Sequence, residues 1–176
     1  MKSKIVFFLF KHTQRLYLEY VKSDQTPWPI KTEDLKCFPE GSLGREMYQF
    51  LKDAGFQLIP KAECHDVNHV LLGVPTEEVA EICLQFILFG NGRRSKYCSL
   101  TCLIGALIYP EKWPEFHQAY LQGRSYEPFW DWDFLPLLDA DLEGLRASLG
   151  IMDVPIEPSF WNEATSRSQK DQDADK

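Results

Sequence analysis

The sequence predicts an all-α fold, a single-domain helical bundle with a metal site between two helices joined by a short turn. Apolar residues recur at helical spacing from about residue 42 onward. Glycine and proline residues stand where these periodic segments would end, and no other part of the chain offers a sheet for a strand to join. The 176 residues, 44% of them hydrophobic, are enough for one buried core.

The first 21 residues are ambiguous, and a helix is favoured there over a strand. The apolar run from Ile5 to Phe10 is shorter than a signal-peptide core, and no small-residue cleavage site follows it. We expect one helical domain over residues 1–161 and a disordered polar tail over residues 162–176. Residues 23–29 and 155–158 are candidate linkers.

Two helices are predicted before the middle of the chain. Ser42 is a suitable N-cap for the first, which Gly55 would end. Its inward face would carry Met47, Phe50 and Leu51. A second helical segment runs from about Lys61 to Leu72, and Gly73-Val74-Pro75 breaks it.

Thr76 is the predicted N-cap of the third helix, with acidic residues in its first turn. Gly90 would end it. One face carries apolar side chains at helical spacing, namely Val79, Ile82, Cys83, Phe86 and Ile87. We expect this face to pack into the core.

The later part of the chain predicts three more helices. The segment from Tyr97 to Tyr109 is apolar all round, which predicts a central buried helix, and it is too short to span a bilayer, which needs about 20 residues. A short helix over Glu115 to Gln122 would stop at Gly123. An amphipathic helix near Asp139 to Leu149 would stop at Gly150.

Charge and cysteine content exclude some classes of function. The net charge of −7 argues against broad nucleic-acid binding, which needs a basic face. Five cysteines show no CxxC pair and no disulfide framework. Cys98 and Cys102 lie four residues apart in an apolar run, which indicates buried free thiols and favours a reducing compartment.

Two histidines in the second predicted helix, His65 and His69, suggest a metal site. On a helix they lie one turn apart on the same face, and two imidazoles four residues apart can bind one metal ion. Imidazole nitrogens suit Zn²⁺ or Fe²⁺. The alternative is a pair of polar residues on a solvated helix face.

Two carboxylates strengthen the metal hypothesis. Asp66 can flank the histidine pair, and Glu81 follows His69 by eleven residues, across the Gly73–Pro75 break. Helices joined by so short a connection usually pack side by side, so Glu81 can meet the imidazoles. Two imidazoles and two carboxylates would form a charge-balanced divalent site.

These motifs resemble one known family. HDVNHVLLGVPTEEVAE is similar to the HDxxH motif, followed eleven residues later by Glu, of a coenzyme Q biosynthesis family that we call Coq-four. LKCFPEGSLGREMYQFL, AYLQGRSYEPFWDWDFLPLL and DLEGLRASLGI resemble other segments of that family, in the same order along the chain. The resemblance covers roughly residues 35–151. It departs from the family in the short N-terminal region, in Asp133, where the family tends to have Glu, and in the tail.

The resemblance implies an all-helical protein of ubiquinone biosynthesis with a divalent metal held by His65, Asp66, His69 and Glu81. It implies oxidative decarboxylation at C1 of a prenylated aromatic precursor, with these four residues as catalytic groups, and a role in organising other quinone-biosynthesis proteins at a membrane. Arg45 and Arg124 match family arginines that could hold an anionic head group; structural ion pairing is the alternative for both. The metal could be Zn, Fe or Mg.

Other functions stay open at this point. One is a non-enzymatic scaffold that binds a prenyl lipid and uses the metal as a structural clip. Another is a metal-dependent hydrolase, which would lack a glutamate base at the second position of the motif. Some apolar residues could line a prenyl groove, but residues at helical spacing are more often part of the core (Phe86, Ile87, Phe89, Leu103, Ile104 and Leu107). Four tryptophans suit a peripheral membrane contact, a homodimer interface or the core (Trp28, Trp113, Trp130 and Trp132).

The absence of an Arg/Ser-rich transit peptide predicts a cytoplasmic protein, either free or at the inner face of the cell membrane.

Overall fold

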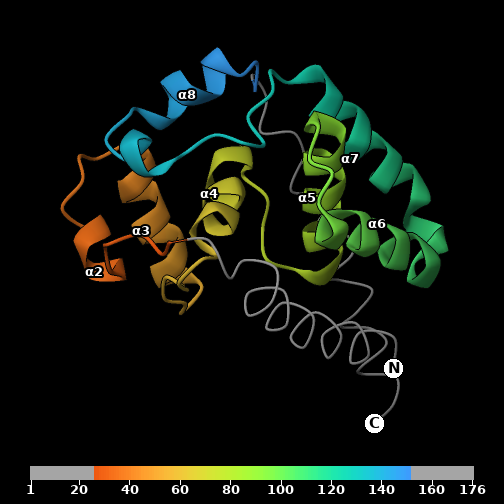
Figure 1. Cartoon of the computed structure of the whole chain (residues 1–176), viewed down its shortest axis with the longest axis horizontal. Helices are drawn as coiled ribbons and strands as arrows, with labels where there is room; N and C mark the ends of the chain where they lie inside the picture. Colours follow the sequence, from red (N-terminus) through yellow and green to blue (C-terminus); the bar gives the residue numbers. More distant parts are fainter. Residues whose placement is uncertain (1–25, 152–176) are drawn as a thin grey trace, which may run out of the picture.

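The structure, a computed structural model, describes residues 26–151 of the chain, and Figure 1 shows that this part is built from helices. Over this range no strand forms, and the bridge between Ser42 and Asp141 is isolated. The all-α prediction is confirmed. The helices are α2 (Thr32–Leu35), α3 (Leu43–Asp53), α4 (Glu63–Leu72), α5 (Glu78–Asn91), α6 (Lys96–Ile108), α7 (Trp113–Ser125) and α8 (Leu142–Ser148), with 3-10 turns η2 (Pro110–Lys112) and η3 (Leu135–Leu137).

Several predictions concern parts of the chain beyond this range. The helix favoured for the first 21 residues, the linker at 155–158 and the tail at 162–176 lie outside the described residues. Within residues 26–151 the buried apolar side chains form one continuous core. The domain limits of 1–161 stay a prediction.

Helix α3 forms as its sequence predicts. The Ser42 side chain caps it by accepting a hydrogen bond from the backbone N–H of Arg45. Met47 and Leu51 are fully buried in the core. The helix ends before Gly55, whose φ of 67° is a conformation that favours glycine.

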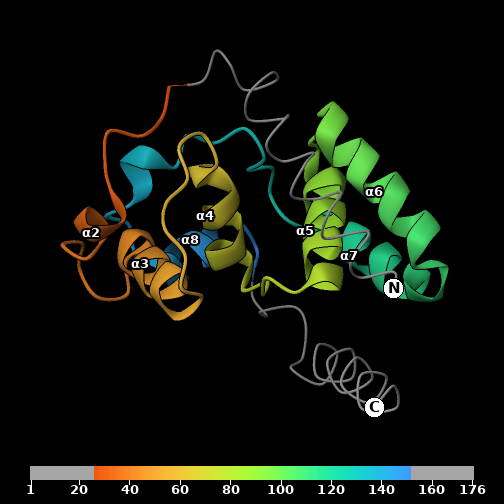
Figure 2. The ribbon, with the colours of Figure 1, turned by 90° about the horizontal axis from the view of Figure 1, so that it is seen from below.

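The helices form two packed groups, which Figure 2 separates to the left and right. α4 packs against α3 and α8, whereas α5 packs against α7 and α6. The expectation that the helices on either side of the Gly73–Pro75 break pack side by side is therefore wrong. Residues 73–77 carry the chain from one group to the other, so α4 and α5 each find their main partners elsewhere.

Gly90 and Gly123, predicted as helix stops, are helix-packing residues inside α5 and α7. A Cβ atom at Gly123 would lie 1.9 Å from the backbone oxygen of Ile87, and one at Gly90 would lie 2.1 Å from that of Tyr120. Only glycine allows backbones to approach so closely. The observed helices run on through Asn91 and Ser125, so both predicted ends were too early.

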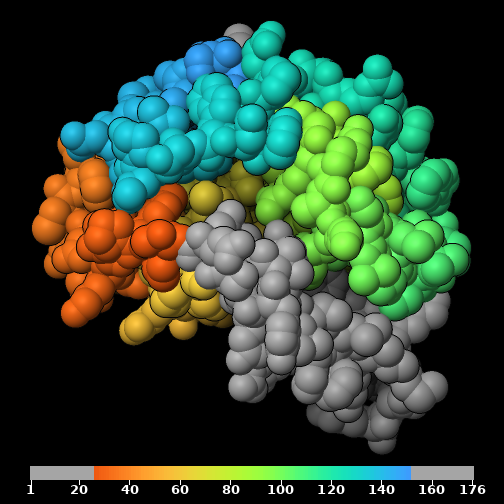
Figure 3. Space-filling view, in the orientation of Figure 1, coloured from red at the N-terminus to blue at the C-terminus, as the bar shows by residue number. Residues whose placement is uncertain are grey.

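Helix α6 is not the central buried helix that its apolar composition predicted. It is the outermost helix on the right in Figure 2, and the green atoms of this part of the chain lie at the surface on the lower right of Figure 3. Its inner face consists of small residues, and a Cβ at Gly105 would lie 2.5 Å from the side chain of Ile82 in α5. Large side chains such as Leu103 and Leu107 point outward and are exposed. A stretch that is apolar all round does not itself show which face the fold covers.

Two other helix starts differ from expectation. The N-cap of α5 is Glu77 rather than Thr76, and its side chain makes no capping hydrogen bond. α8 begins at Leu142, later than predicted, because Asp141 caps it by accepting a hydrogen bond from Gly144. The predicted stop at Gly150 is confirmed by its φ of 73°. None of the helices between residues 26 and 151 has both the length and the apolarity needed to cross a bilayer.

Candidate metal centre

Helix α4 carries both histidines of the candidate site, and the turn after it holds the helix end in place. Gly73 adopts a left-handed conformation, φ 62°. The backbone N–H of Val74 then donates to the carbonyl of His69 at 3.0 Å, which completes a common helix C-cap. This cap turns the chain back toward His69 and places the Val74 carbonyl beside its ring.

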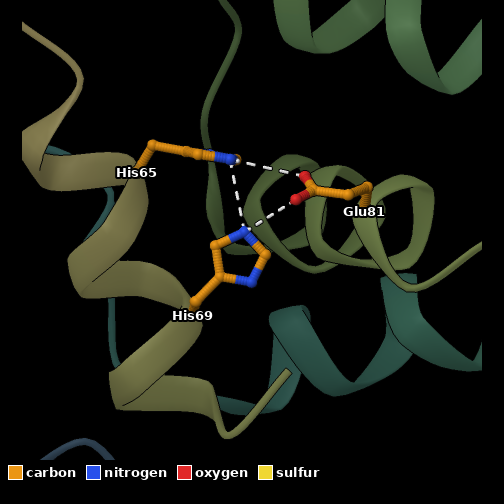
Figure 4. Close-up of side chains that lie close together, drawn as sticks. All are labelled: His65, His69 and Glu81. Atoms are coloured by element: carbon orange, nitrogen blue, oxygen red, sulfur yellow. Dashed lines mark hydrogen bonds and ion pairs between the residues drawn. The ribbon is translucent and has the colours of Figure 1, made fainter. Parts of the chain in front are cut away.

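His65, His69 and Glu81 converge on one point, as Figure 4 shows. The Nε2 atoms of the two histidines are 3.2 Å apart. Glu81 places its Oε1 3.0 Å from Nε2 of His69 and its Oε2 3.4 Å from Nε2 of His65. Metal–ligand bonds of roughly 2.0–2.2 Å put neighbouring ligands about 3.3 Å apart in a tetrahedral site and about 3.0 Å apart in an octahedral one. The three side chains therefore have the spacing that one divalent ion requires.

The surroundings of His69 fix which ring nitrogen faces this point. Nδ1 lies 2.8 Å from the Val74 carbonyl, which can only accept, so Nδ1 carries a hydrogen. The ring stacks on Phe50 at 5.5 Å, and only 2% of His69 is exposed. In metal-binding histidines the ring nitrogen that does not bind the metal is typically hydrogen-bonded to a backbone carbonyl. This hydrogen bond fixes the orientation of the ring and determines which nitrogen carries the hydrogen. In the neutral ring, Nε2 then offers its lone pair to an ion.

Glu81 stands in the first turn of α5 and brings the negative charge. Burial opposes its ionisation, but hydrogen bonds from His65 and His69 and the positive charge of these groups outweigh it and lower its pKa to about 2. Burial likewise opposes the charged form of His69, yet the hydrogen bond and charge of Glu81 raise the pKa of His69 above its usual 6.5. The cluster thus favours bound positive charge, which a proton or a metal ion can supply.

Asp66, predicted as the fourth ligand, lies beside the cluster rather than in it. It is not among the side chains that converge. Its Oδ2 atom is buried without a hydrogen-bond partner. Burial raises its pKa to about 6, although His65 and His69 act in the opposite direction. An unpartnered buried carboxylate oxygen next to two imidazoles fits a site that a cation would complete, as does the donor set of two nitrogens and a carboxylate.

The two predicted head-group arginines are not brought to this site. Arg45, in α3, donates to the backbone carbonyl of Lys36 at 2.5 Å and lies over the ring of Tyr48. Arg124 is exposed near the end of α7. The contacts of Arg45 are those of a structural residue. Binding of an anionic head group by either arginine stays a prediction.

A cleft of about 620 Å³ lies next to the site, between α3, α8 and the turn after α4. Of the three converging side chains, only His69 lines it. Its charged lining consists mostly of acidic residues, namely Glu46, Asp53, Glu77, Asp141 and Glu143, with Arg146. Arg146 already pairs with Glu143. This cleft therefore suits an anionic head group poorly.

The contacts by which two residues shape the site were not expected from the sequence. Phe50 was predicted to face inward, but its stacking on His69 required the packing of α3 on α4. Arg146, in α8, donates to the carbonyls of Val70 at 2.8 Å and Leu71 at 3.0 Å, so it holds the last turn of α4. No local signal could predict these contacts, because Arg146 lies 75 residues from Leu71.

Comparison with known proteins gives one informative result. No protein-family model matches the chain, and no curated protein matches it. Among solved structures, the chain is similar to the crystal structure of a protein from Nostoc punctiforme PCC 73102 that is named "Putative ubiquinone biosynthesis protein". The two chains share a fold. The similarity has a TM-score of 0.60 and covers 87% of this chain and 83% of that chain.

The sequence identity between these two chains is 21%, so the similarity shows the fold alone. It agrees with the fold that the Coq-four motifs implied. Membership of that family stays a prediction.

Proposed function

We propose that this chain is a metal-binding protein of ubiquinone or prenylquinone biosynthesis that acts on a prenylated aromatic precursor. One observation carries the proposal: two imidazoles and a carboxylate, from helices in different packed groups, converge at metal-ligand spacing. The order of the Coq-four motifs along the chain supports it, and so does the shared fold with the Nostoc protein.

In this proposal His65, His69 and Glu81 hold the metal, and Asp66 compensates charge beside it. A divalent metal bound there would act as a Lewis acid toward a carboxylate or phenolate oxygen and, if redox-active, could support chemistry with O₂. The side chains of this protein keep the donor atoms in place. Val74 and Phe50 orient the His69 ring, and Arg146 secures the helix end that carries it.

The proposed reaction exchanges the ring carboxylate at C1 for a hydroxyl group. The carbon–carbon bond breaks and the carboxylate leaves as CO₂. One oxygen atom of O₂ enters the ring and takes up one proton to become the hydroxyl group. The other oxygen atom leaves as water with two protons, and a reductant supplies two electrons. The prenyl tail needs apolar surface, for which the partly exposed Phe89 is a candidate. By contrast, Phe86 and Ile87 belong to the core. Other quinone-biosynthesis proteins and the inner face of the cell membrane are the partners that this proposal includes.

The arrangement of the helices favours one alternative. The histidines belong to the group of α3, α4 and α8, and Glu81 belongs to the group of α5, α6 and α7. A metal held by all three would join the two groups, as a structural clip does. The chain would then be a prenyl-lipid-binding scaffold without turnover.

Metal and lipid analysis of one purified sample tests the proposal. We expect about one equivalent of divalent metal, which His65→Ala and Glu81→Ala each remove. His117→Ala and Glu40→Gln are matched controls, because both residues are exposed and outside the cluster, and both variants should keep the metal. Native protein with metal content near zero would refute metal-dependent function.

An assay of substrate conversion distinguishes the enzyme hypothesis from the scaffold hypothesis. The metal-loaded chain is incubated with a carboxylated prenyl-phenol, O₂ and a reductant, and the products are followed by mass spectrometry. With ¹⁸O₂, the enzyme is expected to give a hydroxylated ring that carries one ¹⁸O atom and to release CO₂. A substrate that binds but is never converted would favour the scaffold.

A further inference from the structure

Helix α6 presents a row of leucines to the outside of the molecule. Leu100, Leu103 and Leu107 are 49%, 57% and 72% exposed. They lie three and four residues apart, so they form one straight line along a helix. The same line begins at Lys96, one turn before Leu100. Three large apolar side chains in line form a continuous exposed patch, of the kind that proteins use as contact surfaces.

The opposite face of α6 shows why the leucines point outward. Cys98, Thr101, Cys102 and Gly105 are the buried residues of this helix, and all are small. They let α6 lie close against α5, where Gly105 meets Ile82. The fold therefore covers the small side chains and leaves the large ones for another partner. An ordinary surface helix has the reverse arrangement.

We infer that this row docks against α6 of a second copy of the chain, with the two helices antiparallel. Spacings of four, three and four residues from Lys96 to Leu107 are those of a coiled-coil seam. A two-fold axis between residues 103 and 104 places Leu100 opposite Leu107 of the second copy. It also sets Lys96 near the C-terminal end of α6 in the second copy.

Charge at the two ends of α6 favours this partner. Arg93, Arg94 and Lys96 make the start of the helix basic. Glu111 follows its end, where the neighbouring Lys112 is neutralised by its ion pair with Glu115. The terminal carbonyl groups add negative charge at that end. An antiparallel pair sets each basic end against the acidic end of the other copy. An anionic lipid surface would repel a chain of net charge −7, so it is a less favourable partner for the leucine row than a second copy of the chain.

The pair is expected to be weak. A helix of 13 residues is about 20 Å long, and one helix pair lies at the low end of interface sizes. Association is therefore expected at protein concentrations of tens of micromolar. It does not depend on the metal site, because none of its residues belongs to the converging cluster.

Sedimentation of the full chain tests the pairing. At such concentrations the average mass of the wild type should rise clearly above the 20.5 kDa of one chain, and it should move toward twice that value as the concentration increases further. Leu103→Glu buries a charge near the axis and should raise the dissociation constant by about 30-fold or more. Leu121→Glu is the matched control. Leu121 is 47% exposed but lies in α7, so that variant should dimerise like the wild type.

Disulfide cross-linking tests the direction of the helices. In a Cys37→Ser background, which removes an exposed thiol, chains carrying Leu100→Cys are mixed with chains carrying Leu107→Cys and oxidised. The antiparallel pair predicts cross-links between the two kinds of chain. Cross-links within the Leu100→Cys sample alone would show parallel helices and overturn the proposed geometry.

Two other results would overturn the proposal. One is a wild-type chain that stays monomeric at high concentration. The other is a dimer that Leu103→Glu leaves unchanged. If the monomer instead co-sediments with phosphatidylcholine vesicles and Leu103→Glu abolishes this, lipid is the occupant of the leucine row and the proposal is wrong.

Discussion

Replacing Glu81 by glutamine in metal-free protein measures how much the interaction of its carboxylate with His65 and His69 contributes to the folding free energy. The pKa of Glu81 falls from 4.5 to about 2, because its hydrogen bonds to His65 and His69 outweigh its burial. One pKa unit corresponds to about 1.4 kcal/mol, so the shift represents on the order of 3 kcal/mol of folding free energy. The glutamine variant should lose a stabilisation of that order.

The stability that Glu81→Gln removes should become smaller both at low pH and at high pH. A lowered folded-state pKa gives stability that is present above pH 4.5 and lost as the pH falls toward about 2. The raised pKa of His69 gives stability that is present below 6.5 and lost as the pH rises through the raised value. The difference in unfolding free energy between wild type and Glu81→Gln should therefore be largest between these two limits.

Urea unfolding with a chelator present, followed by tryptophan fluorescence between about pH 3 and 8, measures this difference. Glu40→Gln is the control, because Glu40 is exposed and its variant should differ from the wild type by a few tenths of a kcal/mol at most. The coupling of Glu81 to the histidines would be refuted by a loss below about 1 kcal/mol near pH 5.5. It would also be refuted by a loss that grows as the pH falls below 4.

Three further predictions concern residues that hold the site or its framework. Asn91 makes buried hydrogen bonds through both atoms of its amide, so Asn91→Ala should lower the unfolding free energy by about 3 kcal/mol in the same urea assay. Gly123→Ala sets a methyl group against the Ile87 carbonyl and should cost about 3 kcal/mol or more, seen as a lower Tm. Arg146→Met releases the last carbonyls of α4 and should weaken metal binding about tenfold by calorimetric titration. Unchanged metal affinity in that variant would show that the helix end needs no support from α8.

Local chemistry predicted much of the fold correctly. The Ser42 cap and the stops at Gly55 and Gly150 are decided by neighbouring residues, so they could be derived from the sequence. Gly90 and Gly123 were misread, because a glycine that allows helices to touch has the same local pattern as one that ends a helix. The direction in which α6 faces was misread for a similar reason, since its composition is apolar on every side.

The sequence by itself determined the helical class and the candidate ligands His65, His69 and Glu81. Helical spacing places the two histidines on one face whatever surrounds them. Only the tertiary structure decided that Glu81 reaches them from a different packed group, that Asp66 stays beside the cluster, and that Phe50 and Arg146 support it. These contacts join residues far apart in the chain, and their geometry depends on how whole helices pack, which no local pattern records.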